Sequence, residues 1–182
     1  GDPRDPATDV GPVIDAEAKG NLEAHLAAMR AASFAKIAFA GRAPATGTFV
    51  APHIVELDRP QRLGREVFGP ILHVVRWKAD ALDDAIDAIA ATGYGLTLGI
   101  HSRIDETVSH IIDRLAVGNV YVNRNIIGAV VGTQPFGGSG LSGTGPKAGG
   151  PDYLRRFAVE QVVSVNTAAA GGNASLIAMD DE

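Results

Sequence analysis

The sequence predicts an α/β fold, a mostly parallel sheet with flanking helices, and two observations support this class. Short β-rich runs alternate with amphipathic helical runs between residues 70 and 123, a pattern typical of parallel strands joined by helices. In addition, 46% of the 182 residues are hydrophobic and 20% are charged, which is the balance of a folded domain rather than a disordered chain. A chain of this length can bury one core.

The first predicted element is a helix over residues 15–32, with Asp15 as its N-cap. Its apolar residues recur at helical spacing and define the face to be buried: Leu22, Leu26 and Met29. Two β-rich runs follow, at residues 34–40 and 48–57. Gly and Pro residues separate the runs, and this spacing predicts an antiparallel pair with an irregular connection.

Strands and helices then alternate through the middle of the chain. The predicted strands cover residues 70–77, 95–101 and 118–123, and the predicted helices cover 80–92 and 105–116. Both helices carry apolar stripes for packing on the sheet: Leu82, Ile86 and Ile89 in the first, and Val108, Ile111, Ile112 and Leu115 in the second. In the last strand the apolar side chains alternate with polar ones: Val120 and Val122 against Asn119 and Tyr121.

The chain is predicted to consist of a body and two C-terminal segments. The body, residues 1–157, ends with a Gly-rich run at 125–151 and a short helix at 152–157. Nine of the 27 residues in the Gly-rich run are Gly, and a long irregular run within a domain is usually functional. Residues 158–167 form a β-rich, valine-containing segment, and residues 168–182 form a small, polar and then acidic tail that we expect to be frayed.

Composition excludes several kinds of site. The sequence contains no Cys, so it has no disulfide, no thiolate metal site and no Cys nucleophile. Its five His residues occur singly, and we predict no metal site. The net charge of -5, with scattered Lys and Arg, disfavours nucleic-acid binding. No apolar window is long enough for a membrane span and no secretion signal is present, so we expect a cytoplasmic protein.

A glycine pattern at residues 138–143 fits the G-x-G-x-x-G dinucleotide fingerprint, but its context does not. That fingerprint follows a strand directly and opens a helix, whereas this run lies well beyond the predicted strand at 118–123 and precedes no helix. Tight turns, for which glycine has the needed backbone freedom, explain the pattern better.

The run Glu66-Val67-Phe68-Gly69-Pro70, directly before a predicted strand, is more informative. A carboxylate such as Glu66 can accept hydrogen bonds from both hydroxyls of a ribose, and Phe68 can place a flat apolar face against an aromatic ring. Considered alone, the run is explained equally well by a loop acid and a core phenylalanine.

This run resembles the cofactor-contacting segment of the aldehyde dehydrogenase superfamily, and other runs match that superfamily in order along nearly the whole chain. They include residues 94–96, 118–123 and 134–140. The resemblance implies the distal part of an aldehyde dehydrogenase catalytic domain that uses NAD. It also implies that Glu66 holds the nicotinamide ribose and that Phe68 packs beside the nicotinamide.

One branch of the superfamily is more similar than the rest. Residues 128–136 and 143–151 resemble the L-glutamate γ-semialdehyde (1-pyrroline-5-carboxylate) dehydrogenases. The resemblance implies that the backbone N–H groups of Gly128 and Ala129 anchor the substrate's α-carboxylate and that Phe136 flanks its aliphatic part. Two successive N–H donors at a small-residue turn do form an anion-binding nest.

Residues 165–173 are similar to the bifunctional proline utilization enzymes of this branch, in which an FAD-dependent proline dehydrogenase domain precedes the aldehyde dehydrogenase. The implied activity is oxidation of L-glutamate γ-semialdehyde to L-glutamate in proline catabolism. In the superfamily, the strand equivalent to residues 158–167 pairs with a neighbouring subunit, which implies a homo-oligomer. A core strand remains the alternative for this segment.

The sequence departs from the superfamily because the Cys that attacks the aldehyde is missing. The resemblance implies that the Asn oxyanion donor, the Glu base and the dinucleotide-binding domain also lie outside these residues. We therefore assign no catalytic residue and expect the isolated chain to be inactive. Two alternatives stay open. One is an aldehyde dehydrogenase of different substrate specificity, and the other is a non-catalytic assembly or binding fragment.

Overall fold

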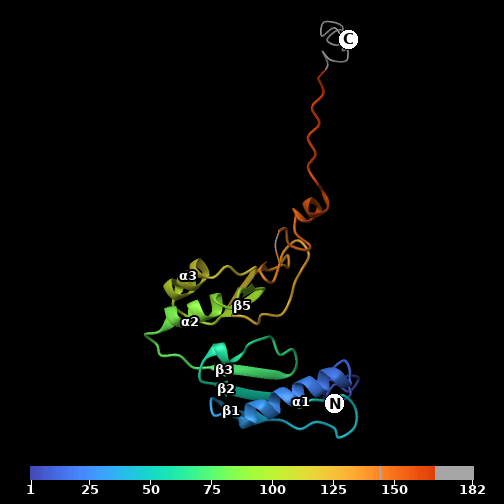
Figure 1. Ribbon diagram of the computed structural model, residues 1–182, viewed down its shortest axis with the longest axis vertical. Coiled ribbons are helices and arrows are strands. Elements are labelled where there is room, and N and C mark those ends of the chain that lie inside the picture. Colours follow the sequence, from blue (N-terminus) through green and yellow to red (C-terminus); the bar gives the residue numbers. More distant parts are fainter. Residues whose placement is uncertain (144, 167–182) are drawn as a thin grey trace.

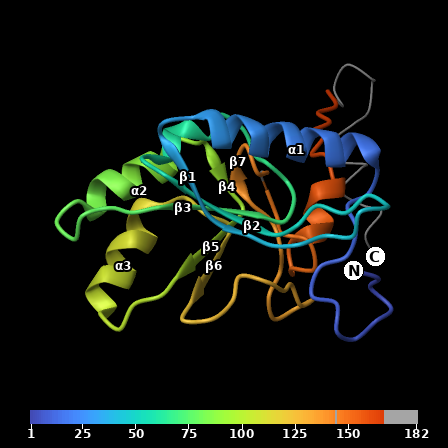
Figure 2. The same ribbon diagram turned by 90° about the horizontal axis from the view of Figure 1, so that it is seen from below.

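The computed structural model describes residues 1–143 and 145–166, which form two sheet-containing units, a Gly-rich region and an extended C-terminal arm (Figure 1). The first unit is a three-stranded sheet with one long helix on one face (Figure 2). Its elements are α1 (Ala16–Ala31), β1 (Ala35–Ala40), β2 (His53–Leu57), the 3-10 helix η1 (Pro60–Arg62) and β3 (Ile71–Val75).

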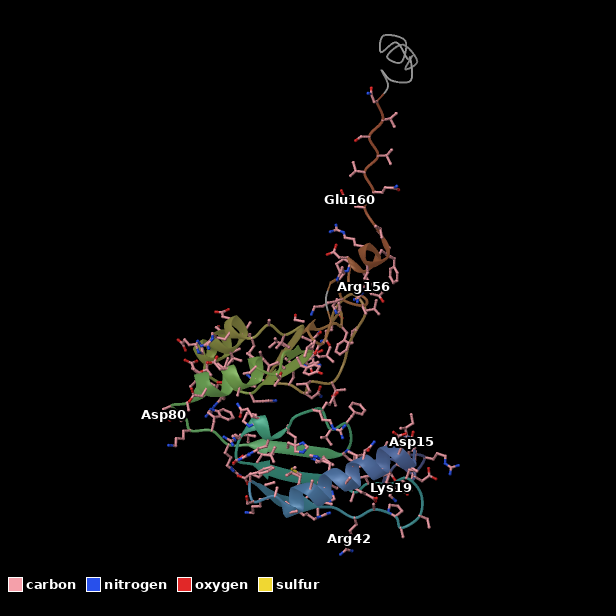
Figure 3. The ribbon with its side chains drawn as sticks, viewed as in Figure 1. Asp15, Lys19, Arg42, Asp80, Arg156 and Glu160 are labelled. Carbon is pink, nitrogen blue, oxygen red and sulfur yellow. The ribbon has the colours of Figure 1, made fainter. Side chains whose placement is uncertain are left out.

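Helix α1 begins where the sequence predicts it. The Asp15 carboxylate accepts a hydrogen bond from the backbone N–H of Ala18 at 2.7 Å, which satisfies one of the free donors of the first turn. One turn later, the Lys19 ammonium donates to the carbonyl of Gly47 at 3.1 Å, so the start of α1 is tied to the loop before β2 (Figure 3). The predicted helix over residues 15–32 and its N-cap are confirmed.

The first core lies between α1 and the sheet. The predicted helical stripe packs there against residues of β2 and β3 and of the segment before β2. Together they form the buried cluster: Leu22, Leu26, Met29, Val50, Val55, Leu57 and Ile71. Strand β1 runs antiparallel to β2, as predicted, and β2 runs parallel to β3. On the opposite face of the sheet, the strand register aligns Phe39, Ile54 and Leu72 in a row. Phe39 is 51% exposed and Leu72 is 58% exposed, so this apolar row has no covering layer among the described residues.

The second unit contains two helices beside a parallel strand pair. Its elements are α2 (Leu82–Ala90), β5 (Thr97–Ile100), α3 (Asp105–Arg114) and β6 (Asn119–Val122). Ion pairs join the helices, because Arg114 contacts Asp83 and Asp87, and His110 lies 2.6 Å from Asp83. The hydrogen bond from His110 is the largest influence that lowers the pKa of Asp83. Strands β5 and β6 run parallel, as predicted.

The Gly-rich region is held by short-range pairing rather than by long elements. The two-residue strand β7 (Ser139–Gly140) pairs with β4 (Tyr94–Gly95), and single β-bridges join Val130 to Gln134 and Phe136 to Ala148. The 3-10 helix η2 (Tyr153–Phe157) follows, where a short helix was predicted. Residues 158–166 then form an extended arm that leaves the body (Figure 1), with Glu160 lying beyond Arg156 of η2 (Figure 3).

The α/β class is confirmed, but several details of the prediction are wrong. The strand predicted at 95–101 is divided, because β4 pairs with β7 while β5 pairs with β6. The described strands form three separate sheets instead of one. In β6 the buried side chain is Tyr121, whereas Val122 is 37% exposed.

The apolar stripes of the two shorter helices are only partly buried. Ile86 is 2% exposed, but Ile89 and Ile112 are 40% and 42% exposed. The predicted β run at the C-terminus forms no strand within residues 158–166, so its pairing stays a prediction. Residue 167 and the tail 168–182 lie outside the described residues.

The chain exposes a large surface for its size. Its accessible area is 13561 Å², whereas a compact monomer of 18.8 kDa exposes about 8300 Å². No helix in the described part of the chain is long and apolar enough to cross a membrane.

Candidate cofactor and substrate site

The predicted cofactor segment lies immediately before β3, with its side chains on alternating sides. Val67 packs against the core under α1, while Glu66 and Phe68 point outward, Phe68 being 88% exposed. Gly69 follows at a point of close approach, where a Cβ would lie 2.6 Å from Cδ1 of Leu22. The contact between Gly69 and Leu22 sets the segment against α1. A carboxylate and an aromatic ring are thereby presented together to solvent, an arrangement that fits a ribose and a flat heterocycle.

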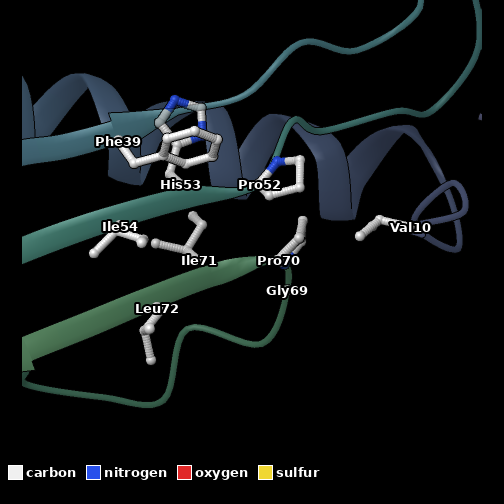
Figure 4. A pocket seen from close by; sticks show the side chains of 9 residues that line it. All are labelled: Val10, Phe39, Pro52, His53, Ile54, Gly69, Pro70, Ile71 and Leu72. Carbon is white, nitrogen blue, oxygen red and sulfur yellow. The ribbon is translucent and has the colours of Figure 1, made fainter.

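An apolar groove of about 410 Å³ lies beside this segment, across the uncovered face of the first sheet (Figure 4). It includes Gly69 and Pro70 but neither Glu66 nor Phe68. Its one charged or polar side chain, His53, has both ring nitrogens engaged: Arg30 donates to Nε2 at 3.1 Å, and Nδ1 lies 2.7 Å from the carbonyl of Ala51. With no free polar group, the groove is suited to covering by apolar side chains.

A larger cavity of about 600 Å³ lies between the end of β3, α2 and β5. Apolar side chains from all three elements line it, including Val75, Ile86 and Ile100. None of the predicted site residues lies on it, so it belongs to the junction of the two units rather than to the predicted site.

The predicted substrate-binding turn combines a positive-φ glycine with two backbone donors that have no partner among the described residues. Gly128 has a φ of 120°, a conformation that L side chains rarely adopt, while Ala129 does not have a positive φ. Among the described residues, neither the N–H of Gly128 nor that of Ala129 donates a hydrogen bond. Both residues are exposed. The two successive donors are therefore available to an anion.

The strand β6 holds this turn and the loop after it. The hydroxyl of Tyr121 donates to the carbonyl of Gly128 at 2.6 Å. Two residues earlier on the same face of the strand, Asn119 donates to the carbonyl of Pro135 at 2.9 Å and accepts from the N–H of Gly137 at 3.3 Å. The backbone of the intervening Phe136, the predicted substrate neighbour, is thus fixed from both sides.

Lys147 adds a second anchor to the same loop. Its ammonium group donates to the carbonyl of Gly118 and lies 3.4 Å from the carbonyl of Gly137 and 3.5 Å from Oδ1 of Asn119. Reciprocal backbone hydrogen bonds of 3.0 and 2.9 Å join Phe136 to Ala148. Lys147 therefore ties the two limbs of the Gly-rich region to the start of β6.

The predicted cofactor and substrate segments lie on the same side of the molecule, away from α2 and α3 (Figures 1 and 2). No hydrogen bond, ion pair or ring contact among the described residues joins residues 66–68 to residues 128–136. Two serines of the second unit and the Gly-rich region make contacts to the backbone: Ser142 accepts from the N–H of Gly95 at 3.0 Å, and Ser102 bonds to the backbone of Ile104.

Sequence reasoning missed the loop-holding role of Asn119 and Tyr121. Their i, i+2 spacing on a predicted strand was the available signal, because it places two polar side chains on one face. It also missed the meeting of His25 and His73, which come from α1 and β3, 48 residues apart. Within residues 1–143 and 145–166, no three His, Cys, Asp or Glu side chains converge as metal ligands would.

Comparisons with known proteins identify relatives of this chain. The chain is 59% identical over 153 residues to the bifunctional protein PutA of Rhizobium meliloti, an alignment that covers 83% of this chain but 12% of the relative. It is 36% identical over 169 residues to human mitochondrial delta-1-pyrroline-5-carboxylate dehydrogenase, covering 87% of this chain and 30% of that protein. The chain thus spans a small part of the relatives it matches.

Solved structures give the same picture. A crystal structure of a Bradyrhizobium japonicum proline utilization A mutant is similar with a TM-score of 0.84 and 65% identity, covering 94% of this chain and 17% of that one. The 1-pyrroline-5-carboxylate dehydrogenase from Thermus with bound NAD is similar with a TM-score of 0.72 and 37% identity. The match covers 81% of this chain and 28% of that chain. Residues 1–163 match the sequence profile of the aldehyde dehydrogenase family. The chain therefore belongs to the aldehyde dehydrogenase family.

Proposed function

We propose that this chain is the substrate- and cofactor-holding part of an NAD-dependent L-glutamate γ-semialdehyde (1-pyrroline-5-carboxylate) dehydrogenase of proline catabolism. One observation carries the proposal: the adjacent N–H donors of Gly128 and Ala129, which have no partner among the described residues. An anion placed there would receive two hydrogen bonds from one turn. Relatives named 1-pyrroline-5-carboxylate dehydrogenase support a substrate of this class, which carries an α-carboxylate.

The proposed cofactor is NAD, held at its nicotinamide end by Glu66 and Phe68. NAD supplies the hydride acceptor when it is bound. The chain's own contribution is to present the Glu66 carboxylate to the ribose hydroxyls and the exposed Phe68 ring beside the nicotinamide. A Thermus relative whose structure contains NAD supports this choice of cofactor.

The covalent step requires a thiolate that this chain does not contain. In the proposal, a complete enzyme supplies that thiolate from a region outside the 182 residues. The chain by itself binds and orients groups but does not oxidise the aldehyde. In the complete enzyme, Phe136 would pack along the aliphatic part of the substrate.

We further propose that the arm at residues 158–166 pairs with a neighbouring copy of the subunit. Its valines are well exposed, between 73% and 94%: Val159, Val162, Val163 and Val165. An extended apolar segment with exposed side chains is a ready surface for strand pairing. Such pairing would cover these side chains.

A chimaera tests the substrate assignment. The matching 153-residue segment of the Rhizobium meliloti relative is replaced by this chain's residues, and kcat/KM is measured with L-glutamate γ-semialdehyde and with butyraldehyde, which lacks the carboxylate. Ala129→Pro deletes one N–H donor, and Ala129→Gly is the control that keeps it. A lost donor to a charged group costs roughly 1.5–3 kcal/mol, or about 10- to 150-fold in kcat/KM.

We expect Ala129→Pro to lower kcat/KM for the semialdehyde by that factor and to leave butyraldehyde oxidation nearly unchanged. Equal losses with both aldehydes would show that the turn is only structural. No loss with either aldehyde would remove Ala129 from the site. Both outcomes would reduce the assignment to an aldehyde dehydrogenase of another specificity.

A further inference from the structure

Tyr121 is buried beneath the Gly128 turn and holds it by a single strong contact. Its side chain is 5% exposed, and its hydroxyl donates to the carbonyl of Gly128 at 2.6 Å. The guanidinium of Arg124 lies 4.9 Å over the centre of the Tyr121 ring. The phenol is therefore enclosed by its own strand β6 and by the residues that lead into the turn.

The contact fixes the direction of a neighbouring donor. The carbonyl of Gly128 and the N–H of Ala129 belong to one planar peptide group, and no cis peptide bond occurs among the described residues. In a trans peptide the C=O and N–H point in opposite directions. Because Tyr121 holds the carbonyl from inside, the N–H of Ala129 must point outward. Hydrogen bonding at the carbonyl also polarises the peptide and strengthens its N–H as a donor.

The far end of the loop is anchored independently. Val130 and Gln134 exchange backbone hydrogen bonds of 3.0 and 2.7 Å, and Asn119 and Lys147 hold residues 135–137. Loss of the Tyr121 hydroxyl would therefore free the Gly128–Ala129 peptide while leaving the rest of the loop attached. This separation makes a specific test possible.

We propose that Tyr121 is a positioning residue for carboxylate recognition, acting through the peptide plane of Gly128 and Ala129. Its hydroxyl does not touch the substrate. It orients and polarises the N–H that does, so it contributes to affinity for aldehydes that carry a carboxylate and not to the chemical step. This inference rests on the proposed function.

The test uses the Rhizobium meliloti chimaera with Tyr121→Phe, which removes only the hydroxyl. Tyr94→Phe is the matched control, because Tyr94 is 62% exposed and its hydroxyl makes no hydrogen bond among the described residues. We expect Tyr121→Phe to raise KM for L-glutamate γ-semialdehyde by about 2- to 12-fold, the range for one neutral hydrogen bond. The kcat, the KM for butyraldehyde and the thermal midpoint should stay close to those of Tyr94→Phe.

The outcomes separate this inference from the proposed function. If Ala129→Pro reduces only semialdehyde oxidation while Tyr121→Phe leaves that KM unchanged, the site stands and the positioning role is wrong. Equal increases in KM for both aldehydes, or a lower kcat with unchanged KM, would also contradict it. If Ala129→Pro shows no selectivity, the proposed function fails whatever Tyr121→Phe does.

A second measurement uses this chain itself, so the inference can be tested without an active chimaera. Hydrogen exchange is followed by mass spectrometry in Tyr121→Phe and Tyr94→Phe. We expect the amides of Val130 and Gln134 and the strands β5 and β6 to exchange at the same rate in both variants, because contacts other than the Tyr121 hydroxyl hold them. Faster exchange at residues 130–134 or throughout β6 in Tyr121→Phe would contradict the positioning role and indicate a merely structural tyrosine.

Discussion

The Nε2 atoms of His25 and His73 lie 2.9 Å apart across the interface between α1 and β3, with their rings edge to face. One ring must donate and the other accept, so this hydrogen bond requires at least one neutral imidazole. Burial is the main cause that lowers the pKa of both histidines. The charge of Arg65 adds to the effect on His25, and the charge of His25 adds to the effect on His73.

The pair predicts a loss of stability in mild acid. Because both pKa values are lower in the folded chain, the unfolded chain binds more protons below the ordinary histidine value of 6.5, and stability falls as the pH drops through this range. Urea unfolding at pH 7.5 and 5.5 should show a smaller pH effect in the double variant His25→Gln, His73→Gln than in the wild type. His101→Gln, at an exposed position after β5, is the control, and an equal pH effect in all three proteins would contradict the prediction.

The N-cap of α1 predicts a stability change of known size. Asp15→Ala removes the acceptor for the N–H of Ala18 and should lower the free energy of unfolding by about 0.5–2 kcal/mol. Asp15→Asn keeps an acceptor and should lower the free energy of unfolding much less. Asp9→Ala, an exposed aspartate before the helix, should have little effect in the same urea titration. A loss from Asp9→Ala equal to that from Asp15→Ala would indicate a general charge effect instead of a cap.

Glu66 can be tested in the chimaera through the cofactor. In Glu66→Gln an amide replaces the carboxylate that accepts from two ribose hydroxyls, so KM for NAD should rise. The lost hydrogen bonding to the ribose is worth roughly 1.5–3 kcal/mol of binding free energy, which corresponds to an increase in KM for NAD of about 10- to 150-fold. KM for the aldehyde should change little, and Glu106→Gln on exposed α3 should change neither. Unchanged KM for NAD and unchanged kcat would exclude Glu66 from the cofactor site.

The isolated chain should not oxidise aldehydes, because it has no thiolate nucleophile. Purified chain is mixed with NAD and L-glutamate γ-semialdehyde, and NADH is followed at its absorbance maximum. The rate should equal that of buffer, while the chimaera under the same conditions should produce NADH. Turnover by the chain alone would contradict the proposed division of roles.

The uncovered sheet face predicts self-association of the isolated chain. The row of Phe39, Ile54 and Leu72 is apolar and accessible, and contiguous exposed apolar patches promote association. Leu72→Lys should shift sedimentation velocity profiles toward the monomer. Ile104→Lys is a matched control, because both side chains are 58% exposed and Ile104 lies outside the row. A wild-type chain that stays monomeric at high concentration would show that the face needs no cover.

The parts of the fold that depend on nearby residues were predictable from the sequence. The helical spacing of Leu22, Leu26 and Met29 and the cap at Asp15 are local signals, and both match the structure. The division of the strand at 95–101 was not predictable in this way. It depends on the pairing of Tyr94 with Gly140, and the glycine side of that pair carries no β pattern.

In the site, too, features set by nearby residues were predictable and contacts between distant residues were not. The exposure of Glu66 and Phe68 and the open turn at Gly128 agree with the predicted roles, although those roles stay proposals. The Tyr121 contact to Gly128 was missed because Val120 and Val122 were the apolar residues of β6, and an aromatic hydroxyl can be buried when a carbonyl accepts from it. Sequence spacing alone does not show that a carbonyl is nearby.

The division of the strands into separate sheets has a consequence for folding order. The sheet β1–β2–β3 draws on residues 35–75, and the pair β5–β6 draws on residues 97–122. Each set of strands is therefore built from a short stretch of chain. Contacts between residues that are near in sequence form faster than contacts between distant residues. During synthesis, the first sheet can form before the ribosome has released β6, whereas the pairing of β4 with β7 must wait for residue 140. The substrate turn, which Tyr121 and the bridge between Val130 and Gln134 hold, can form once residue 134 is available, after the first sheet and before the pairing of β4 with β7.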